Sequence, residues 1–284
     1  MINKFFDFNI HPDLNFISNK VLKSQVANEF NVDVKNLNLS FQSFLENLNP
    51  NMKKYFLGAN LMIFSNFFEK RPQELTSFVL SVKKLFEKDN IKTSFTFLID
   101  PRSENFLEIL DNCKKNDVKF IKFHSYHQKI DVSLLENCKR IALEAEKRNI
   151  GICIDASYGT KYLYKYDNLL LASEILDVVL KAPVIILHLG GIRALEAALI
   201  IQDTENGYIE TSFSPIFFEK CSIYSDFIDC LKLINVERIL YASDYPYINI
   251  EDSVKAAEKL FKKVCFTTNE REKIFYKNAI NLTK

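Results

Sequence analysis

Features that mark a membrane-spanning or exported protein are missing from this 284-residue chain. Its longest apolar stretches, such as Pro183 to Leu189, have the length of a β-strand, whereas a helix that crosses a bilayer needs about 20 apolar residues. Residues 1–7 include an acid where a signal sequence keeps its apolar segment. The sequence therefore argues against a membrane span and an export signal, and we expect a cytoplasmic protein.

An excess of charge of one sign is missing as well. Lysine and arginine together number 37, and aspartate and glutamate number 36. No net field is present that could hold nucleic acid or an acidic membrane surface by releasing counterions. We therefore expect a small-molecule substrate rather than nucleic acid or a membrane as the partner, and the sequence leaves open whether the chain forms a homo-oligomer.

Tryptophan is absent, and the six cysteines form no Cys-x-x-Cys pair, which favours buried free thiols over a metal or redox site. No internal repeat, low-complexity tract or linker rich in Pro, Gly or Ser divides the chain. The share of hydrophobic residues, 48%, is ordinary for a globular protein. Because α/β barrels commonly reach this length as one unit, we predict a single domain over residues 1–284.

Short apolar runs of strand length recur along the chain and alternate with amphipathic stretches of helical period, such as Ser133 to Arg148. The eight runs are Phe5–Phe8, Phe56–Phe64, Ser94–Ile99, Phe120–Phe123, Ile150–Ile154, Val184–Leu187, Tyr208–Thr211 and Arg238–Ala242. Alternation of strand and helix implies a parallel sheet, and eight repeats close most simply into a (β/α)₈ TIM barrel. A doubly wound open sheet is the alternative.

The segment from Pro12 to Tyr55 is longer than an ordinary loop between a strand and a helix. It carries helical patterns around Val21 to Phe30 and Leu37 to Leu48. We expect a helical insertion here, which acts either as a lid over the barrel mouth or as a helical pair that covers the side of the barrel.

The four histidines of the chain are not spread at random. His11, His124 and His188 fall within a residue or so of the carboxyl end of a predicted strand, and His127 lies just beyond, where a solvated loop position is expected. Because substrate sites of (β/α)₈ barrels are built at that end of the strands, this distribution predicts a site at the barrel mouth.

Other polar residues join the histidines at the predicted strand ends. Side chains two residues apart share a face of a strand. The sets that do so are Asp7, Asn9 and His11; Lys122 and His124; and Glu210 and Ser212. We expect the ammonium of Lys122 to pair with Asp7 or Glu210, or to bind a carboxylate or phosphate of the substrate.

Asp155 and Asp244 follow the fifth and eighth apolar runs. Each could be only a turn or capping residue, but both lie with the histidines at the predicted mouth. Two carboxylates, two or three imidazoles and one amide that converge there can hold a divalent cation such as Zn²⁺ or Mn²⁺. A water bound to such a cation becomes a nucleophile near neutral pH.

Four segments of the chain follow one another in a familiar order. They are Asp7-Phe-Asn-Ile-His11-Pro12, Lys122-Phe-His124, His188-Leu-Gly-Gly191 and Ser243-Asp244-Tyr-Pro246. Together they resemble the amidohydrolase superfamily, in particular its amidohydrolase-2 branch of metal-dependent hydrolases and decarboxylases, over nearly the whole chain. The closing Asn278-Ala-Ile-Asn-Leu resembles the last helix of that branch.

The resemblance implies a distorted (β/α)₈ barrel in which His11 is a metal ligand on the first strand and His188 contacts substrate or serves as acid or base. It makes Asp244 the residue that binds metal or activates water. Two positions depart from the pattern, because Asn9 replaces the first histidine of a His-x-His pair and Asp155 stands where another histidine is expected. The implied ligand set is therefore His11, Asp155, Asp244 and Asn9, unless the loss of two imidazoles has abolished metal binding.

These residues predict a metal-dependent hydrolase of a small polar amide, lactone or ester, in which Asp244 accepts a proton from water and His188 stabilises the oxyanion or protonates the leaving group. A nonhydrolytic decarboxylase and a catalytically inactive ligand-binding barrel are the alternatives. The residues expected to bind substrate are His124, Lys122, Arg102 and Glu210. Arg102 is a candidate clamp for a carboxylate, or else a capping or surface ion-pair residue.

Overall fold

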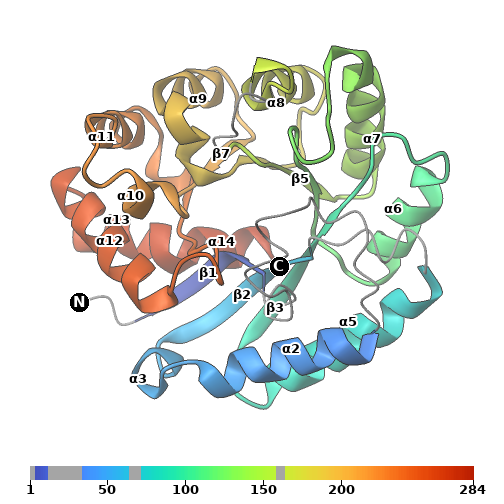
Figure 1. Ribbon diagram of the computed structural model, residues 1–284, viewed down its shortest axis with the longest axis horizontal. Coiled ribbons are helices and arrows are strands. Elements are labelled where there is room, and N and C mark those ends of the chain that lie inside the picture. Colours follow the sequence, from blue (N-terminus) through green and yellow to red (C-terminus); the bar gives the residue numbers. More distant parts are fainter. Residues whose placement is uncertain (1–3, 12–33, 64–71, 158–163) are drawn as a thin grey trace.

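Eight parallel strands lie side by side in the order in which they occur in the chain (Figure 1). This computed structural model describes residues 4–11, 34–63, 72–157 and 164–284. The strands are β1 (Phe5–Ile10), β2 (Phe56–Ile63), β3 (Lys92–Leu98), β4 (Phe120–Phe123), β5 (Gly151–Ile154), β6 (Val184–Ile186), β7 (Gly207–Glu210) and β8 (Ile239–Leu240). The predicted strands are confirmed, with ends that differ by a few residues at most.

The chain after β8 returns to β1 and nearly closes the barrel. The backbone N–H of Phe8 donates to the carbonyl oxygen of Tyr241 at 3.1 Å, and that of Asp244 donates to Asn9 at 2.8 Å. The N–H of His11 donates to Tyr245 at 2.7 Å. These bonds confirm the predicted TIM barrel, and they hold the end of β1 beside the segment that carries Asp244.

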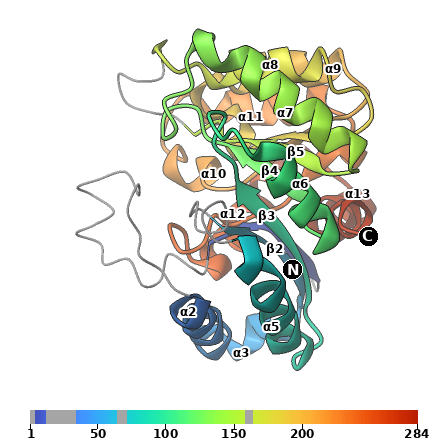
Figure 2. The same ribbon diagram turned by 90° about the vertical axis from the view of Figure 1, so that its right-hand side faces the viewer.

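Helices cover the outside of the barrel (Figures 1 and 2). The helices longer than one turn are α2 (Val34–Asn47), α5 (Leu75–Glu87), α6 (Phe106–Lys115), α7 (Leu135–Lys147), α8 (Asn168–Leu176), α9 (Ala194–Gln202), α11 (Tyr224–Leu233) and α12 (Ile250–Lys263). Shorter helical segments are α3 (Pro50–Lys53), α10 (Ser214–Phe217), α13 (Thr268–Glu272), a π-helical turn at Lys273–Lys277 and α14 (Asn278–Leu282), with 3₁₀ turns at Pro72–Glu74, Val132–Leu134, His188–Arg193 and Val236–Arg238. No described helix is both long enough and apolar enough to cross a membrane.

An apolar plug fills the lower part of the barrel beneath the polar mouth. Phe120, Cys153 and Leu240 belong to this plug and are buried completely or almost completely. Because alternate residues of a strand share a face, Lys122 and Asp155 continue the inward rows that Phe120 and Cys153 begin. Because the apolar plug offers no polar partners, the polar residues at the ends of these rows must pair with one another at the carboxyl ends of the strands.

The described part of the insertion covers the side of the barrel. Helix α2 lies beside α5 (Figure 2). Phe41 and Phe44 of α2 pack against Phe86 of α5, with ring centroids 6.2 and 6.1 Å apart. Phe44 also lies 5.0 Å from the ring of Tyr245. The helix predicted around Leu37 to Leu48 is thus present as a side cover, and the pattern at Val21 to Phe30 lies outside the described residues.

Candidate active site

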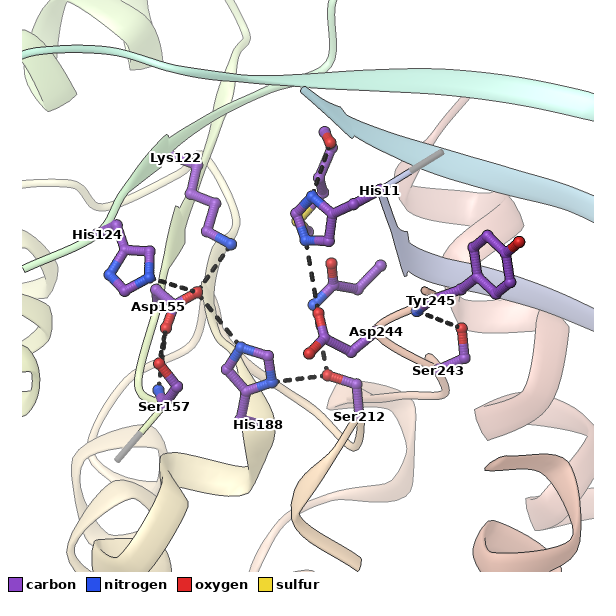
Figure 3. A network of polar contacts seen from close by, with 12 residues as sticks. His11, Lys122, His124, Asp155, Ser157, His188, Ser212, Ser243, Asp244 and Tyr245 are labelled. Atoms are coloured by element: carbon purple, nitrogen blue, oxygen red, sulfur yellow. Dashed lines mark hydrogen bonds and ion pairs between the residues drawn. The ribbon is translucent and has the colours of Figure 1, made fainter. Parts of the chain in front are cut away.

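The predicted mouth residues meet at the carboxyl ends of five strands (Figure 3). His11 follows β1, Lys122 and His124 come from the end of β4, Asp155 follows β5, His188 lies just beyond β6, and Asp244 lies beyond β8. All six side chains are buried, with 2–6% of each residue exposed. Such a concentration of buried ionisable groups needs mutual compensation, because a lone buried charge is costly.

Asp155 is the centre of one group of contacts. Its Oδ2 atom lies 2.8 Å from Lys122 Nζ, 3.3 Å from His188 Nε2 and 3.7 Å from His124 Nε2. Its Oδ1 atom accepts hydrogen bonds from the backbone N–H, at 3.0 Å, and the hydroxyl of Ser157. Burial alone would raise the pKa of Asp155, but the basic side chains around Oδ2 hold it well below its usual value.

The sequence led us to expect Asp7 or Glu210 as the partner of Lys122, and the ion pair with Asp155 corrects this expectation. Strand order explains the difference. Lys122 lies on β4 and Asp155 directly follows β5, and these neighbouring parallel strands pair Lys122 with Cys153. The carboxylate two residues further along is therefore the first acid that the lysine meets at the mouth.

His188 carries a proton on both ring nitrogens. The hydroxyl of Ser212 donates its one proton to Glu210 Oε2 at 2.9 Å, so at His188 Nδ1, 2.8 Å away, the serine oxygen accepts. His188 Nε2 then donates to Asp155 Oδ2. Burial would lower the pKa of His188, but Asp155 outweighs that effect and raises it to about 9. The ring is therefore an imidazolium at neutral pH.

The backbone around His188 is held in an uncommon conformation. His188 and Leu189 have φ values of 59° and 55°, in the left-handed region that costs a non-glycine residue about 1–3 kcal/mol. The His188 N–H donates to Glu210 Oε2 at 3.1 Å, and its carbonyl oxygen accepts from the Ser214 hydroxyl at 2.6 Å. At Gly190, with φ of 73°, a Cβ atom would lie 2.5 Å from Ala197 Cβ. These contacts fix the imidazolium in place.

His11 and Asp244 form a second group. His11 Nδ1 lies 2.8 Å from the carbonyl oxygen of Met62, which can only accept, so Nδ1 carries the proton. His11 Nε2 then faces Asp244 Oδ1 at 3.5 Å. This fixed tautomer presents a basic nitrogen beside a carboxylate, which is an arrangement suited to removing a proton from water.

Asp7 and Asn9 lie beneath this pair and are fully buried. Asp7 Oδ1 accepts from the backbone N–H of Ser243 at 2.9 Å, and burial raises the pKa of Asp7 to about 7. The side-chain amide of Asn9 donates to Ser212 Oγ at 3.4 Å. Asp7 therefore holds the segment before Asp244, and Asn9 supports the serine that contacts His188.

The other residues expected to bind substrate have structural partners. Arg102 donates to the carbonyl oxygens of Gln128 and Lys129 at 2.9 and 3.1 Å and pairs with Asp100 at 3.1 Å, so it joins two loops at the mouth. Glu210 accepts from His188 and Ser212, as described above. Its carboxylate orients the histidine from below.

Three features of the site were not anticipated from the sequence. His127, expected in solvent, is half-buried with its ring 5.4 Å from that of His124, and burial lowers its pKa to about 4. Tyr126 packs edge-on against His124 at 4.4 Å, and Ser157 connects Tyr126 with Asp155. The spacing Asp155-Ala-Ser157 is a signal for the serine contact, because aspartate commonly bonds the backbone two residues on.

The donor atoms of the mouth do not fit a divalent cation. Catalytic metal sites commonly use three strong protein ligands. In the part of the chain that the structure describes, no group of three or more His, Cys, Asp or Glu side chains is arranged to hold a metal ion. His11 and Asp244 converge as a pair, whereas a cation on Asp155 Oδ2 would have to displace the Lys122 ammonium. The expected set of His11, Asn9, Asp155 and Asp244 is therefore divided between two groups.

Residues 91–282 match the amidohydrolase-2 family, described as amidohydrolases. The match spans more than half of the chain, and the protein therefore belongs to this family, as the sequence motifs indicated. A search of curated proteins found no significant match.

Solved structures with the same fold include a probable 2-pyrone-4,6-dicarboxylic acid hydrolase from Acinetobacter baumannii with bound citric acid, at 16% identity, a TM-score of 0.62 and coverage of 99% of both chains. A 4-oxalomesaconate hydratase from Rhodopseudomonas palustris has 16% identity and a TM-score of 0.60, and the alignment covers 98% of this chain and 95% of that one. A dihydroxybenzoic acid decarboxylase from Polaromonas with bound manganese and 2-nitroresorcinol has 12% identity and a TM-score of 0.53, with coverage of 99% and 97%.

At these identities the solved structures show a shared fold. The family match alone places the protein among the amidohydrolases, and the structures that share its fold include a probable hydrolase, a hydratase and a decarboxylase. The decarboxylase structure holds manganese and 2-nitroresorcinol, and the probable hydrolase structure holds citric acid. Fold and superfamily alone do not choose among these reactions.

Proposed function

We propose that the protein hydrolyses a small polar ester, lactone or amide. The observation that carries this proposal is that a base and an acid lie in one mouth: the His11–Asp244 pair can accept a proton, and His188 carries a proton on both ring nitrogens. Hydrolysis needs both, because the attacking water must lose a proton and the leaving group must gain one.

In the proposed reaction, water is held beside Asp244 Oδ1 and His11 Nε2. Asp244 accepts a proton as the water oxygen attacks the carbonyl carbon, and the electron pair of the carbonyl double bond moves to its oxygen. The positive groups His188 and Lys122 stabilise that oxyanion. When the bond to the leaving group breaks, His188 supplies the proton that the leaving oxygen or nitrogen needs.

Two cationic side chains of the mouth favour a substrate that carries a carboxylate or another anionic group. Lys122 and His188 lie at Asp155, and an anionic group of the substrate can pair with them. Two of the relatives above are named for multiply carboxylated substrates, and one of these holds citric acid. We therefore expect small carboxylated lactones, esters or amides to be better substrates than neutral ones.

A panel of such compounds, assayed for acid release, tests the proposal. Replacing Asp244 by Asn should lower kcat/KM by about 10²–10⁴-fold, because the acceptor for the water proton is lost. Asp229→Asn is the matched control, since Asp229 is an exposed aspartate on α11 that pairs with Lys232. Equal rates for wild type and Asp244→Asn on every hydrolysed compound would overturn the assigned role.

Decarboxylation is the second candidate, and the doubly protonated His188 favours it, because loss of CO₂ leaves a carbanion that must be protonated. Measuring CO₂ release from aromatic and unsaturated acids separates it from hydrolysis. A folded protein that binds these compounds but converts none of them is instead a ligand-binding barrel that has lost catalysis.

A further inference from the structure

The Lys122 ammonium and the Asp155 carboxylate form the most deeply buried ion pair of the mouth. Nζ and Oδ2 are 2.8 Å apart, and the two side chains are 3% and 4% exposed. Burying an ammonium costs several kcal/mol unless an acid compensates for the lost hydration. Replacing such a pair as a whole by apolar residues is often neutral for stability, so stability alone does not explain the pair.

Lys122 approaches Asp155 where two histidines also lie close. Asp155 Oδ2 is 3.7 Å from His124 Nε2 and 3.3 Å from His188 Nε2. Among the described residues these side chains are not arranged to hold a metal ion. The ammonium enters this group from β4 and contacts the same oxygen.

Hydrogen bonds to protein groups occupy both ring nitrogens of His188. Its Nε2 donates to Asp155, and its Nδ1 donates to Ser212, whose own proton is committed to Glu210. A metal ligand must instead offer a lone pair from a ring nitrogen. The hydrogen-bond chain from Glu210 to Ser212 thus sets His188 as a donor toward Asp155.

We propose that the Lys122 ammonium takes the place of a divalent cation in this mouth, so that the protein works without a metal ion. The proposal deepens the proposed hydrolysis and rests on it for the catalytic part. The ammonium is a positive charge that lies 2.8 Å from Asp155 Oδ2 at the mouth. Lys122 thereby supplies positive charge to the carbonyl oxygen of the substrate, and Asp155 positions it.

The first experiment uses the wild-type protein and no substrate. After dialysis against a chelator, Zn²⁺ and Mn²⁺ are titrated separately and followed by calorimetry, and metal content is measured by mass spectrometry. We expect metal content far below one ion per chain and no saturable binding heat. Binding of one Zn²⁺ or Mn²⁺ per chain that is lost in His11→Ala would overturn the proposal.

The second experiment removes the ammonium by replacing Lys122 with alanine. In Lys122→Ala the place beside Asp155 Oδ2 is open to an added cation, and Zn²⁺ at about 100 times its Kd should raise Tm by roughly 5 °C. Wild type should show no such rise. The matched control is Lys139→Ala, because Lys139 is also an ion-paired lysine but lies on α7 with Glu136 and Glu174.

A Lys122→Ala protein that has the circular dichroism spectrum of wild type but gains no affinity for Zn²⁺ or Mn²⁺ contradicts the proposal. If this variant does not fold, the wild-type titration alone decides. Neither measurement needs turnover. Both can therefore be interpreted even if the proposed hydrolysis is wrong. With a substrate in hand, wild-type kcat should be unchanged by chelator and should fall about 10²–10³-fold in Lys122→Ala.

Discussion

Two aspartates at the barrel mouth have different surroundings. Asp155 is surrounded by donors, with Lys122 Nζ at 2.8 Å and His188 Nε2 at 3.3 Å from one oxygen and Ser157 bound to the other. Asp244 faces His11 Nε2 at 3.5 Å, beyond ordinary hydrogen-bond length. A carboxylate held by several donors is a poor base, whereas one beside a basic nitrogen can still accept a proton. The surroundings therefore assign an electrostatic role to Asp155 and a chemical role to Asp244.

Neutralising each aspartate in turn tests this difference most directly. Asp155→Asn leaves the buried Lys122 and His188 without their common acid, and we expect the free energy of unfolding to fall by about 3–5 kcal/mol. Asp244→Asn removes a weaker contact and should change it by about 1 kcal/mol or less. Urea denaturation measures the free energy of unfolding of both variants. An equal decrease in the two would show that Asp155 stabilises the fold no more than Asp244 does.

The pH dependence of stability tests the role of Asp155 as the partner of His188. The pKa of His188 is raised to about 9 in the folded protein, against about 6.5 when unfolded. The stabilisation of the folded state by protonated His188 is therefore fully present below pH 6.5 and is lost as the pH rises through 9. We expect the free energy of unfolding to fall by a few kcal/mol across this window. Urea denaturation between pH 6 and 10, at constant ionic strength, measures it.

Asp155→Asn is the informative variant in this series, because Asp155 is the main group that raises the pKa of His188. The alkaline loss of stability should largely disappear in Asp155→Asn and persist in Asp244→Asn. The pKa of Asp7, raised to about 7, also makes stability decrease with rising pH, but mainly below pH 7. An alkaline loss that stays the same in Asp155→Asn would contradict the assigned His188–Asp155 coupling.

The smallest expected effect concerns Arg102, at the rim of the mouth. Its side chain is 45% exposed and ties two loops together. Arg102→Ala should lower the free energy of unfolding by about 1 kcal/mol and leave KM nearly unchanged. An increase of KM by about tenfold for a carboxylated substrate would support the other role predicted for Arg102, a clamp on the substrate.

Much of the fold could be predicted because its signals are local. The run Phe120 to Phe123 was predicted with the ends that the structure gives, and β5 differs from its prediction by one residue. Apolar runs of strand length, each followed by a polar residue, indicate the strands of the barrel. The covering position of α2 was only one of two alternatives, because it depends on contacts between Phe44 and the distant Phe86 and Tyr245.

The candidate site was predictable as a set of residues but not as a set of pairs. His11, Lys122, Asp155 and Asp244 were all expected at the mouth, and all are there. The sequence could not show that Lys122 meets Asp155, because that contact depends on the register between β4 and β5. It also could not show the protonation of His188, which depends on one serine hydroxyl from the next strand.

The amino-acid pattern is sufficient to predict the alternation of strands and helices, the family and the end of the barrel at which polar residues gather. These follow from periodicity and from the cost of placing polar side chains in an apolar interior. Which charges neutralise each other depends on the fold, because Coulomb energies and hydrogen bonds depend on distances of a few ångströms between residues far apart in the chain. For this reason the sequence suggests Asp155 as a metal ligand, whereas in the fold Asp155 is the ion-pair partner of Lys122.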